Sequence, residues 1–453
     1  MKKMIPLLTS LLLVLGFLQI GTAKNYVVDP KTGSMQNDGS ANHPWRTLAE
    51  VLQTQTFAGG DTLFLRSGFH GDGFRITGRH AAPVTIIAQK GHTPVLLNIT
   101  VSGSFWVLDG LTFTPEGNAA KGTPGSAFDN GRLLTFAKNS ADNIVQNARF
   151  YSVKDASEWQ LEDWRKNVWS GIMDHGQRNT IRNNALFNIA YAIEFEEDCQ
   201  HALVENNRIE NFSGDGIRNG GGDYITVQYN LVKNSIELDP NPHDGNHEDG
   251  IQAWKGKIDD DAVNGMIIRG NYVLNYSKLD RPFRGIMQGI GFFDGPYRNL
   301  VIENNVVIVE HGHGIALYGA YDCKIINNTV LPFPGTFPYI LGPPWIMIHA
   351  HKDGASSTGN IVRNNLSTRL ILEIGSAVQD HNVYGDAATR FVNDYNHFDF
   401  RPKPDYSYNG VSIIDTGSPD LAPSRDIDGV PRPQGRGVDI GAYEYSDSTE
   451  SSR

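Results

Sequence analysis

The segment TIRNN at residues 180–184 recurs along the middle of the chain in closely related forms. The other copies are LVENN at 203–207, TVQYN at 226–230, IIRGN at 267–271, VIENN at 301–305, IINN at 325–328 and IVRNN at 361–365. Each copy is a β-branched run that ends in Asn, and three of the six intervals between the final Asn residues are 23 residues long. Asn tolerates tight-turn dihedral angles, and stacked amides can hydrogen-bond between repeats. The repeat therefore predicts an all-β chain wound as a parallel β-helix, with one Asn turn in each coil.

A second strand in each coil carries an Ile that follows a small or aromatic residue. These marker residues are Ile172, Ile193, Ile217, Ile251, Ile290, Ile315 and Ile346. If the markers face inward, side-chain alternation turns the next residue and the third residue outward. The pattern thus predicts which side chains line the outer face of one sheet.

Composition limits the classes of function. The chain has 453 residues, of which 40% are hydrophobic and 20% charged, so it can bury a large core. Its formal net charge of −11 does not suit a nucleic-acid partner and repels polyanions at long range. An acidic ligand would therefore need a locally basic cleft.

The N-terminus has the pattern of an export signal. Lys2 and Lys3 precede an apolar run over residues 5–20, and Gly21-Thr22-Ala23 supplies small residues before a cleavage site. We expect residues 1–23 to be a signal peptide, which makes the mature chain a secreted or periplasmic protein. No later stretch is apolar enough to span a membrane. Residues 446–453 are expected to form a flexible tail.

The only two cysteines are Cys199 and Cys323. They fall in segments placed four coils apart, and coils stack at about 4.8 Å, so about 20 Å separates the thiols. We expect both to be buried core thiols rather than a disulfide.

Both ends of the chain resemble pectin-lyase-like right-handed parallel β-helix proteins. YVVDP and DGSANHPWRTLAEVL within residues 26–52, with GGDTLFLRSGFH at 59–70, resemble their opening, where a short helix caps the first coil. DIDGVPRP and GVDIGAYEY within 426–445 resemble their closing segment. The resemblance implies one right-handed β-helix domain over residues 24–445, with an N-terminal cap at about 24–70 and a closing segment at about 410–445. That superfamily includes lyases, hydrolases, epimerases and non-catalytic binders, so the activity stays open.

Three long loops interrupt the coils. From the repeat Asn to the next marker, short coils take nine or ten residues, whereas 21, 19 and 18 residues precede Ile251, Ile290 and Ile346. All three loops enter the same kind of strand, so we expect one wall along one flank of the helix. Insertions of this kind usually carry function.

The residues two positions before successive markers are Asp215, Asp249, Gln288 and His313. His247 lies four positions before Ile251, so His247, Asp249 and His313 are predicted to converge. Just past the markers, the outward residues include Arg218, Gln252, Trp254, Tyr318 and His349. Aromatic rings beside polar groups suit the faces of sugars.

These residues fit β-elimination on a uronic-acid polysaccharide. Removing the C5 proton needs a base, a group that neutralises the neighbouring carboxylate, and an acid for the leaving oxygen. His247 or Lys255 would be the base and His313 or Tyr318 the acid. The neutralising group would be Gln252, Arg218 or Arg284, and Asp249 would orient a His or bind a metal.

The segment Asp239-Pro240-Asn241-Pro242-His243-Asp244 resembles the DPHD motif of β-helix mannuronan C5-epimerases, with two residues interrupting it. On that resemblance, His243 is a rival base. Asp244 and Glu248 are candidate calcium ligands, because Glu248 and Asp249 precede Lys255 much as acidic ligands precede a catalytic Lys in metal-dependent lyases of the fold.

We therefore predict a polysaccharide lyase that acts as a monomer on an acidic polysaccharide. Three alternatives stay open: a glycoside hydrolase with Asp215 and Asp249 as its carboxylate pair, a polyuronate C5-epimerase, and a non-catalytic binder. Residues 153–169 leave the coils as either a helix or a lid.

Overall fold

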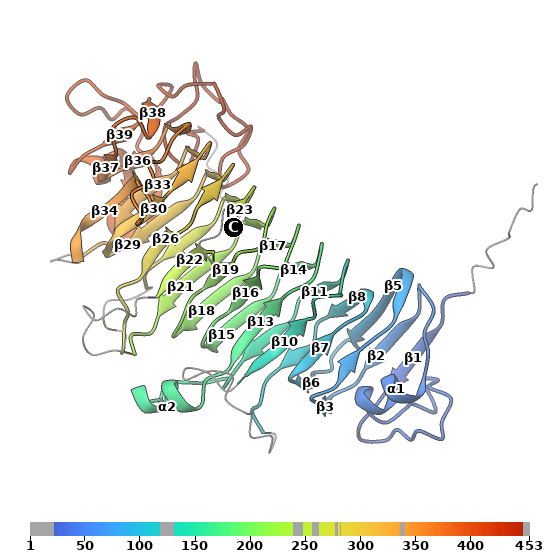
Figure 1. Cartoon of the computed structure of the whole chain (residues 1–453). Helices are drawn as coiled ribbons and strands as arrows, with labels where there is room; N and C mark the ends of the chain where they lie inside the picture. The colour runs from blue at the N-terminus through green and yellow to red at the C-terminus, as the bar shows by residue number, and fades with distance from the viewer. Residues whose placement is uncertain are drawn as a thin grey trace, which may run out of the picture.

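Three long parallel sheets wind into a solenoid in the computed structural model (Figure 1). The structure describes residues 22–117, 131–238, 248–255, 262–276, 280, 282–335 and 340–446. Each turn of the chain adds one strand to each sheet, so strands that are neighbours in a sheet lie one coil apart in sequence. This arrangement confirms the predicted right-handed parallel β-helix.

The 13-stranded sheet carries the TIRNN-type repeats. It comprises β1 (Asn25–Val28), β2 (Thr62–Leu65), β5 (Arg79–Ala88), β8 (Ser104–Asp109), β11 (Ile144–Gln146), β14 (Thr180–Arg182), β17 (Leu203–Glu205), β20 (Thr226–Gln228), β24 (Ile267–Arg269), β28 (Val301–Glu303), β32 (Lys324–Ile326), β35 (Asn360–Arg363) and β38 (Ala377–Asp380).

The 12-stranded sheet follows the Asn turn in each coil. It comprises β3 (Gly68–Asp72), β6 (Pro94–Leu97), β9 (Thr112–Phe113), β12 (Arg149–Tyr151), β15 (Ala185–Ile189), β18 (Arg208–Phe212), β21 (Leu231–Ser235), β25 (Tyr272–Leu274), β29 (Val306–Val309), β33 (Thr329–Pro332), β36 (Leu366–Ser367) and β39 (Val383–Tyr384).

The 11-stranded sheet carries the marker Ile residues. It comprises β4 (Arg75–Ile76), β7 (Ile99–Val101), β10 (Arg132–Phe136), β13 (Ser170–Asp174), β16 (Ile193–Glu196), β19 (Ile217–Gly220), β22 (Asp249–Trp254), β26 (Gln288–Asp294), β30 (His311–Tyr318), β34 (Ile340–His349) and β37 (Arg369–Leu372). Two small sheets complete the described strands: β23 (Val263–Asn264) with β27 (Tyr297–Arg298) and β31 (Ala320–Tyr321), and antiparallel β40 (Val392–Asp394) with β41 (Asp399–Pro402).

The final Asn of each repeat forms a buried ladder between coils. Each side-chain amide donates to the next Asn carbonyl oxygen at 2.9–3.0 Å, in the order Asn184, Asn207, Asn230, Asn271, Asn305, Asn328, Asn365 and Asn382. The residue before each ladder Asn takes the left-handed conformation, as at Asn183 (φ 55°) and Asn304 (φ 55°). The residue before each ladder Asn therefore makes the turn, and the ladder Asn itself forms the hydrogen bonds between coils.

Helix α1 (Leu48–Thr54) lies at the N-terminal end of the solenoid (Figure 1). Thr47 caps it by accepting a hydrogen bond from the Glu50 amide, and Leu48 and Val51 are buried in the main core. The predicted capping helix is therefore present. The closing segment packs Ile413, Ile427 and Tyr443 into a second core with the last coils.

Residues 153–169 contain a second helix, α2 (Leu161–Lys166). Its buried Trp164 packs with Val168, Ala190, Ile236 and Leu238 in a separate hydrophobic cluster. The sequence predicts either a helix or a lid for this segment, and the structure shows a helix that is anchored by Trp164.

The third predicted loop is partly a strand. Residues 340–345 extend β34, where Ile340 pairs with His311 and Trp345 with His313. Leu331 and Pro332 likewise end β33. The expectation that a loop fills the interval before Ile346 was wrong here, because the β30 edge offers backbone partners to the incoming chain.

Cys199 and Cys323 are both buried free thiols, as expected. Burial raises the pKa of each thiol, to about 11 for Cys323. Within the described ranges, no helix is long and apolar enough to cross a membrane.

We expect Asn305→Ala to lower the free energy of unfolding by about 2 kcal/mol, because it removes a buried donor and acceptor at once. Asn305 donates to Asn328 and to Ile268, and Asn271 donates to it. Urea unfolding measures the change. The control Asn393→Ala removes an exposed amide that donates to Asp399 and should cost no more than about 0.5 kcal/mol. Equal losses in the two variants would contradict a stabilising ladder.

Candidate functional site

The marker Ile residues lie in register on seven successive strands of the 11-stranded sheet. Their pairs are Ile172–Ile193, Ile193–Ile217, Ile217–Ile251, Ile251–Ile290, Ile290–Ile315 and Ile315–Ile346. All seven are fully buried. The residues at fixed offsets from them therefore form rows that cross the sheet, as the sequence predicts.

The row two positions before the markers runs along the start of these strands. Asp249 and Gln288 are register partners and begin β22 and β26. His313 comes one coil later and pairs with Trp345, because the register shifts on both sides of His313. Its Nδ1 lies 3.0 Å from Gln288 Oε1. Asp249 and His313 are two coils apart, about 10 Å, with Gln288 between them.

Asp215 and Asp249 form a buried pair of carboxyl groups on adjacent coils. The Asp249 amide donates to Asp215 Oδ1 at 3.0 Å. Burial raises the pKa of Asp215 to about 6. Burial, followed by the neighbouring Asp215 charge, raises the pKa of Asp249 well above its usual range. Both shifts favour the protonated carboxyl groups, because burial and mutual repulsion disfavour two negative charges at this pair.

Asp249 also fixes Gln252 on the outward row. Gln252 Nε2 donates to Asp249 Oδ2 at 2.8 Å, whereas Asp249 Oδ1 is buried without a hydrogen-bond partner. Gly291 on the next coil makes room for this carboxyl. A Cβ at Gly291 would lie 2.6 Å from Asp249 Oδ1 and 2.5 Å from the Phe293 ring. Any larger residue at Gly291 would displace one of them.

Arg218 is held by a ring and two carboxylates. Its guanidinium lies 3.6 Å from the centre of the Tyr191 ring, and its Nε donates to Glu194 Oε2 at 2.9 Å. Its Nη1 lies 3.8 Å from Asp215 Oδ2. Arg132 also donates to Glu194 Oε2, at 3.1 Å. These partners immobilise Arg218 while 20% of its side chain stays exposed.

Aromatic side chains cover the C-terminal part of the same face. Phe293, Trp345 and Met347 are buried together with Ala316 in one small hydrophobic cluster, and Tyr318 packs against it.

Two histidines lie against this cluster. The His313 ring lies 4.7 Å from Phe293 and 5.3 Å from Trp345 between ring centres. Tyr318 pairs in register with His349, and their rings are 5.4 Å apart. The face thus changes from charged at β19 to aromatic at β34.

Trp254 ends β22, and Lys255 follows it. The register between β22 and β26 shifts after Ala253, so Trp254 lies opposite Asp294 rather than Phe293. The Trp254 ring centre is 5.4 Å from the Arg218 guanidinium. Lys255 Nζ donates to the Gly221 carbonyl at 3.2 Å. Trp254 therefore lies beside Arg218, whereas Lys255 contacts the backbone just past the end of β19.

Glu248 and Arg284 lie where the first two long loops meet the sheet. Both Glu248 carboxylate oxygens are buried without a hydrogen-bond partner, and burial, followed by Glu237, raises the pKa of Glu248 well above its usual range. Arg284 forms a β-bridge with Ile236 and approaches the Tyr276 hydroxyl at 3.4 Å.

Three predicted site residues, His243, Asp244 and His247, lie outside the described residues. Their roles stay predictions. Among the residues that the structure describes, no group of three or more His, Cys, Asp and Glu side chains could hold a metal ion. The candidate calcium ligand Asp244 lies outside the described residues, so the calcium site stays a prediction, and we derive no chemical step through it.

Tyr191 and Arg132 are missing from the predicted site, whereas Glu194 lies on the outward row that the marker rule predicts, one position after Ile193. Tyr191 lies two positions before Ile193, so the same rule could have found it. Arg132 begins β10, whose sequence RLLTF carries no Ile marker, and no signal in the sequence linked it to Glu194.

Helix α2 and the described parts of the first two long loops form one wall beside this face. Residues of all three segments share the hydrophobic cluster around Trp164, including Ile236, Leu238 and Phe283. Arg165 donates to the Leu238 carbonyl. Tyr191 packs against the same cluster, and the Arg218 guanidinium lies over the Tyr191 ring. The wall therefore supports the part of the site that contains Arg218.

A family described as "Right handed beta helix region" matches residues 152–330. The solved structure of pectate lyase Pel9A is similar to the whole chain, with a TM-score of 0.52 and 14% sequence identity over 94% of this chain and 98% of that one. A rhamnogalacturonan lyase gives a TM-score of 0.43 and 15% identity over 80% of this chain and 86% of that one. No curated protein matches the sequence. The family match and the pectate lyase structure confirm the right-handed parallel β-helix fold.

We expect Asp215→Asn to flatten the pH dependence of stability between pH 4 and 7. Because the folded pKa of Asp215 is raised to about 6, its neutral form favours folding, and this stability is lost as pH rises through that value. Between pH 4 and pH 7, the free energy of unfolding of the variant should rise by about 3 kcal/mol relative to that of wild type. Chemical unfolding across that range measures the gain.

The exposed Asp420 serves as the control. Asp420→Asn should follow the wild-type curve. If the free energy of unfolding of Asp215→Asn changes with pH as that of wild type does, the raised pKa of Asp215 is contradicted.

Proposed function

We propose that the protein is a polysaccharide lyase that cleaves a uronic-acid-containing polysaccharide by β-elimination. The polysaccharide lies along the outward face of the 11-stranded sheet, from β19 to β34. The observation that carries this proposal is the register pair Arg218–Gln252, which sets a guanidinium beside an amide on that face. Two such neighbouring donors suit a substrate carboxylate.

The carboxylate must lose charge before C5 can lose a proton. Arg218 and Gln252 donate to it and stabilise the enolate-like charge that develops during elimination. Asp249 is the positioning residue, because it holds Gln252 Nε2 through one hydrogen and leaves the other free to donate. The raised pKa of Asp249 disfavours a second negative charge beside the substrate carboxylate.

Proton transfer requires two further groups. His313 binds Gln288 through Nδ1 on the aromatic side of the site and is the first candidate acid. Tyr318 is the second candidate acid. The base comes from His247 or His243 on the first long loop, or from Lys255 beside Trp254.

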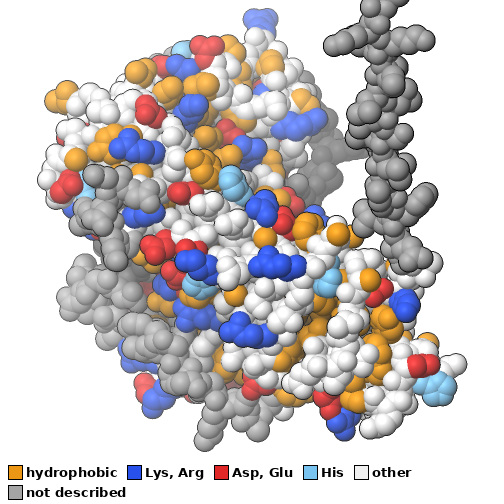
Figure 2. Space-filling view, turned by 45° about the vertical axis from the view of Figure 1, so that its right-hand side comes forward, with side chains coloured by type: hydrophobic (Ala, Val, Ile, Leu, Met, Phe, Trp, Pro, Cys, Tyr) orange, Lys and Arg blue, Asp and Glu red, His pale blue; other side chains and the backbone are white. Residues whose placement is uncertain are grey.

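Aromatic side chains supply the sugar contacts. Trp254 lies beside Arg218, and Tyr318 with His349 lies farther along the sheet. Ring faces at these separate positions suit successive sugar units of one chain. Acidic and basic side chains are interspersed over the side of the molecule that Figure 2 shows, so the net charge of −11 does not gather into one acidic surface on that side.

Glycoside hydrolysis is the second candidate, and the Asp215–Asp249 pair favours it. Hydrolysis needs one protonated and one ionised carboxyl, which the raised pKa values of this pair can provide. Both carboxyl groups are buried, however, whereas Gln252 and Arg218 keep exposed surface. The exposed groups therefore suit elimination better than hydrolysis.

One assay separates the reaction classes. The purified protein is incubated with polygalacturonate, alginate, xylan and mannan, and ultraviolet absorbance and reducing ends are followed together. A lyase produces reducing ends together with the absorbance of unsaturated uronate ends. Reducing ends without absorbance indicate a hydrolase, and exchange of the C5 proton with solvent without cleavage indicates an epimerase. Either result would overturn the lyase proposal.

Gln252→Ala should lower kcat/KM on the substrate found in that assay by about 100-fold, because it removes a donor to the developing negative charge. The matched control is Gln228→Ala, since Gln228 binds Glu205 on the outer face of the neighbouring sheet. Gln228→Ala should keep wild-type activity. Full activity in Gln252→Ala would remove Gln252 from the mechanism.

We also propose that the chain is exported and cleaved before Lys24. The Lys24 amide nitrogen donates to the buried Asp61 carboxylate at 2.9 Å, so cleavage there would replace this bond with an ion pair from the new α-ammonium group. Expression with residues 1–23 in a bacterial host, followed by fractionation and intact-mass measurement, should give an exported chain that begins at Lys24. An uncleaved cytoplasmic product would contradict export.

A further inference from the structure

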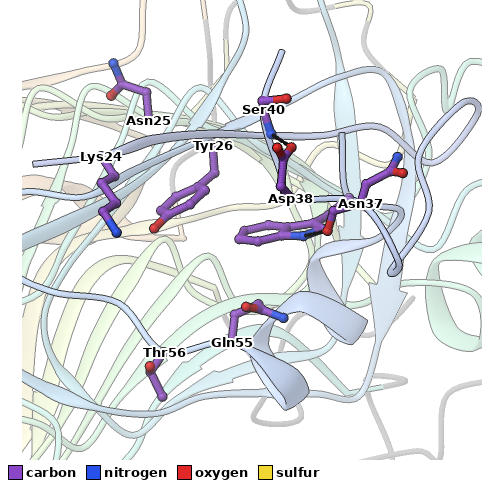
Figure 3. A pocket seen from close by; sticks show the side chains of 9 residues that line it. Lys24, Asn25, Tyr26, Asn37, Asp38, Ser40, Gln55 and Thr56 are labelled. Carbon is purple, nitrogen blue, oxygen red and sulfur yellow. Dashed lines mark hydrogen bonds between the residues drawn. The ribbon is translucent and has the colours of Figure 1, made fainter. Parts of the chain in front are cut away.

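A cavity of about 580 Å³ opens at the N-terminal end of the solenoid (Figure 3). It lies between the start of β1, the turn over residues 37–40 and the end of α1. The lining residues are Lys24, Asn25, Tyr26, Asn37, Asp38, Ser40, Trp45, Gln55 and Thr56. Its volume falls within the range of pockets that hold small organic ligands.

Aromatic rings form one side of this cavity. Tyr26 stacks on Trp45 with ring centres 4.8 Å apart and an angle of 21° between the planes. Phe57 meets Tyr26 edge-on at 5.7 Å. Trp45 is also fixed by its indole N–H, which donates to the Asn37 carbonyl at 2.8 Å. Tyr26 is only half-buried, so this rigid stack presents ring surface to the cavity.

Neutral polar groups and one charge of each sign surround the rings. Lys24 and Asp38 balance each other, while the remaining polar side chains are amides and hydroxyls that can donate and accept (Figure 3). A lining of this kind matches sugar hydroxyl groups better than it matches a carboxylate or phosphate.

The edge of β1 adds backbone groups. On the side of β1 away from β2, the Val27 amide donates to Gly39 and the Val27 carbonyl accepts from Trp45. Because alternate residues of a strand face the same edge, the N–H and C=O of Asn25 point to this side as well. They lie next to the cavity that Asn25 lines.

We propose that this cavity is a binding site for a neutral saccharide, with a sugar ring stacked on Tyr26. It is separate from the candidate active site, because β1 lies seven strands from β20 in the 13-stranded sheet, which corresponds to about 34 Å. The site would hold a neutral part of a mixed polysaccharide at a distance from the bond that is cleaved. The inference does not depend on the reaction proposed for the sheet.

The experiment titrates the purified full chain with cellobiose, xylobiose, mannobiose and digalacturonate, followed by Tyr and Trp fluorescence and calorimetry. At least one neutral disaccharide should bind more tightly than digalacturonate. Tyr26→Ala should weaken that binding about tenfold or more, since it removes the stacking surface. Tyr26→Phe keeps the ring and should keep most of the affinity.

Two further variants keep the test decisive. Thr56→Trp places a large side chain at an exposed position of the lining and should block binding even if Tyr26→Ala unfolds the cap. Tyr224→Ala removes a 46% exposed ring that stacks on His201 outside the cavity, and it should bind like wild type. Binding of digalacturonate alone, no binding of any neutral disaccharide, or binding that survives Thr56→Trp would each overturn the proposal.

Discussion

The Asn ladder is the interaction on which the rest of the structure depends. Each ladder amide donates to the next coil and also to a backbone carbonyl of the preceding one, as Asn305 does with Asn328 and Ile268. A buried amide that loses a hydrogen-bond partner, or whose partner is displaced, destabilises the fold. Every coil must therefore close at the same point, whatever the length of the loop it carries. This constraint explains why insertions before Ile251 and Ile290 leave the marker residues in register.

Because the strand register is fixed, residues that are far apart in the sequence become neighbours in the candidate site. Arg218 and Gln252 are 34 residues apart in the sequence, yet they become neighbours because each follows a marker Ile by one position. The same rule sets Asp249 beside Gln288. The rows themselves could be predicted from the sequence, since they depend only on strand periodicity and on the repeat.

Other parts of the site could not be derived in this way. The register shifts around His313 and after Ala253 depend on local backbone packing, and they move Trp345 and Trp254 away from the positions that strict alternation gives. The burial of Asp249 depends on Gly291, whose importance lies in a close approach across coils. Arg132 contacts Glu194 from a strand that has no marker Ile, so no sequence pattern predicted this contact.

The hydrophobic cluster around Trp164 has a consequence for the order of folding. It joins side chains from Ala156 to Phe283, a span of more than 120 residues, whereas each coil of the solenoid needs only the coil beside it. Contacts between distant parts of a chain form slowly, because loop closure costs entropy before the contacts stabilise it. Coils can therefore wind one by one, but the wall beside Arg218 closes only after the chain has passed Phe283. The protein would acquire its architecture before it acquires a complete site.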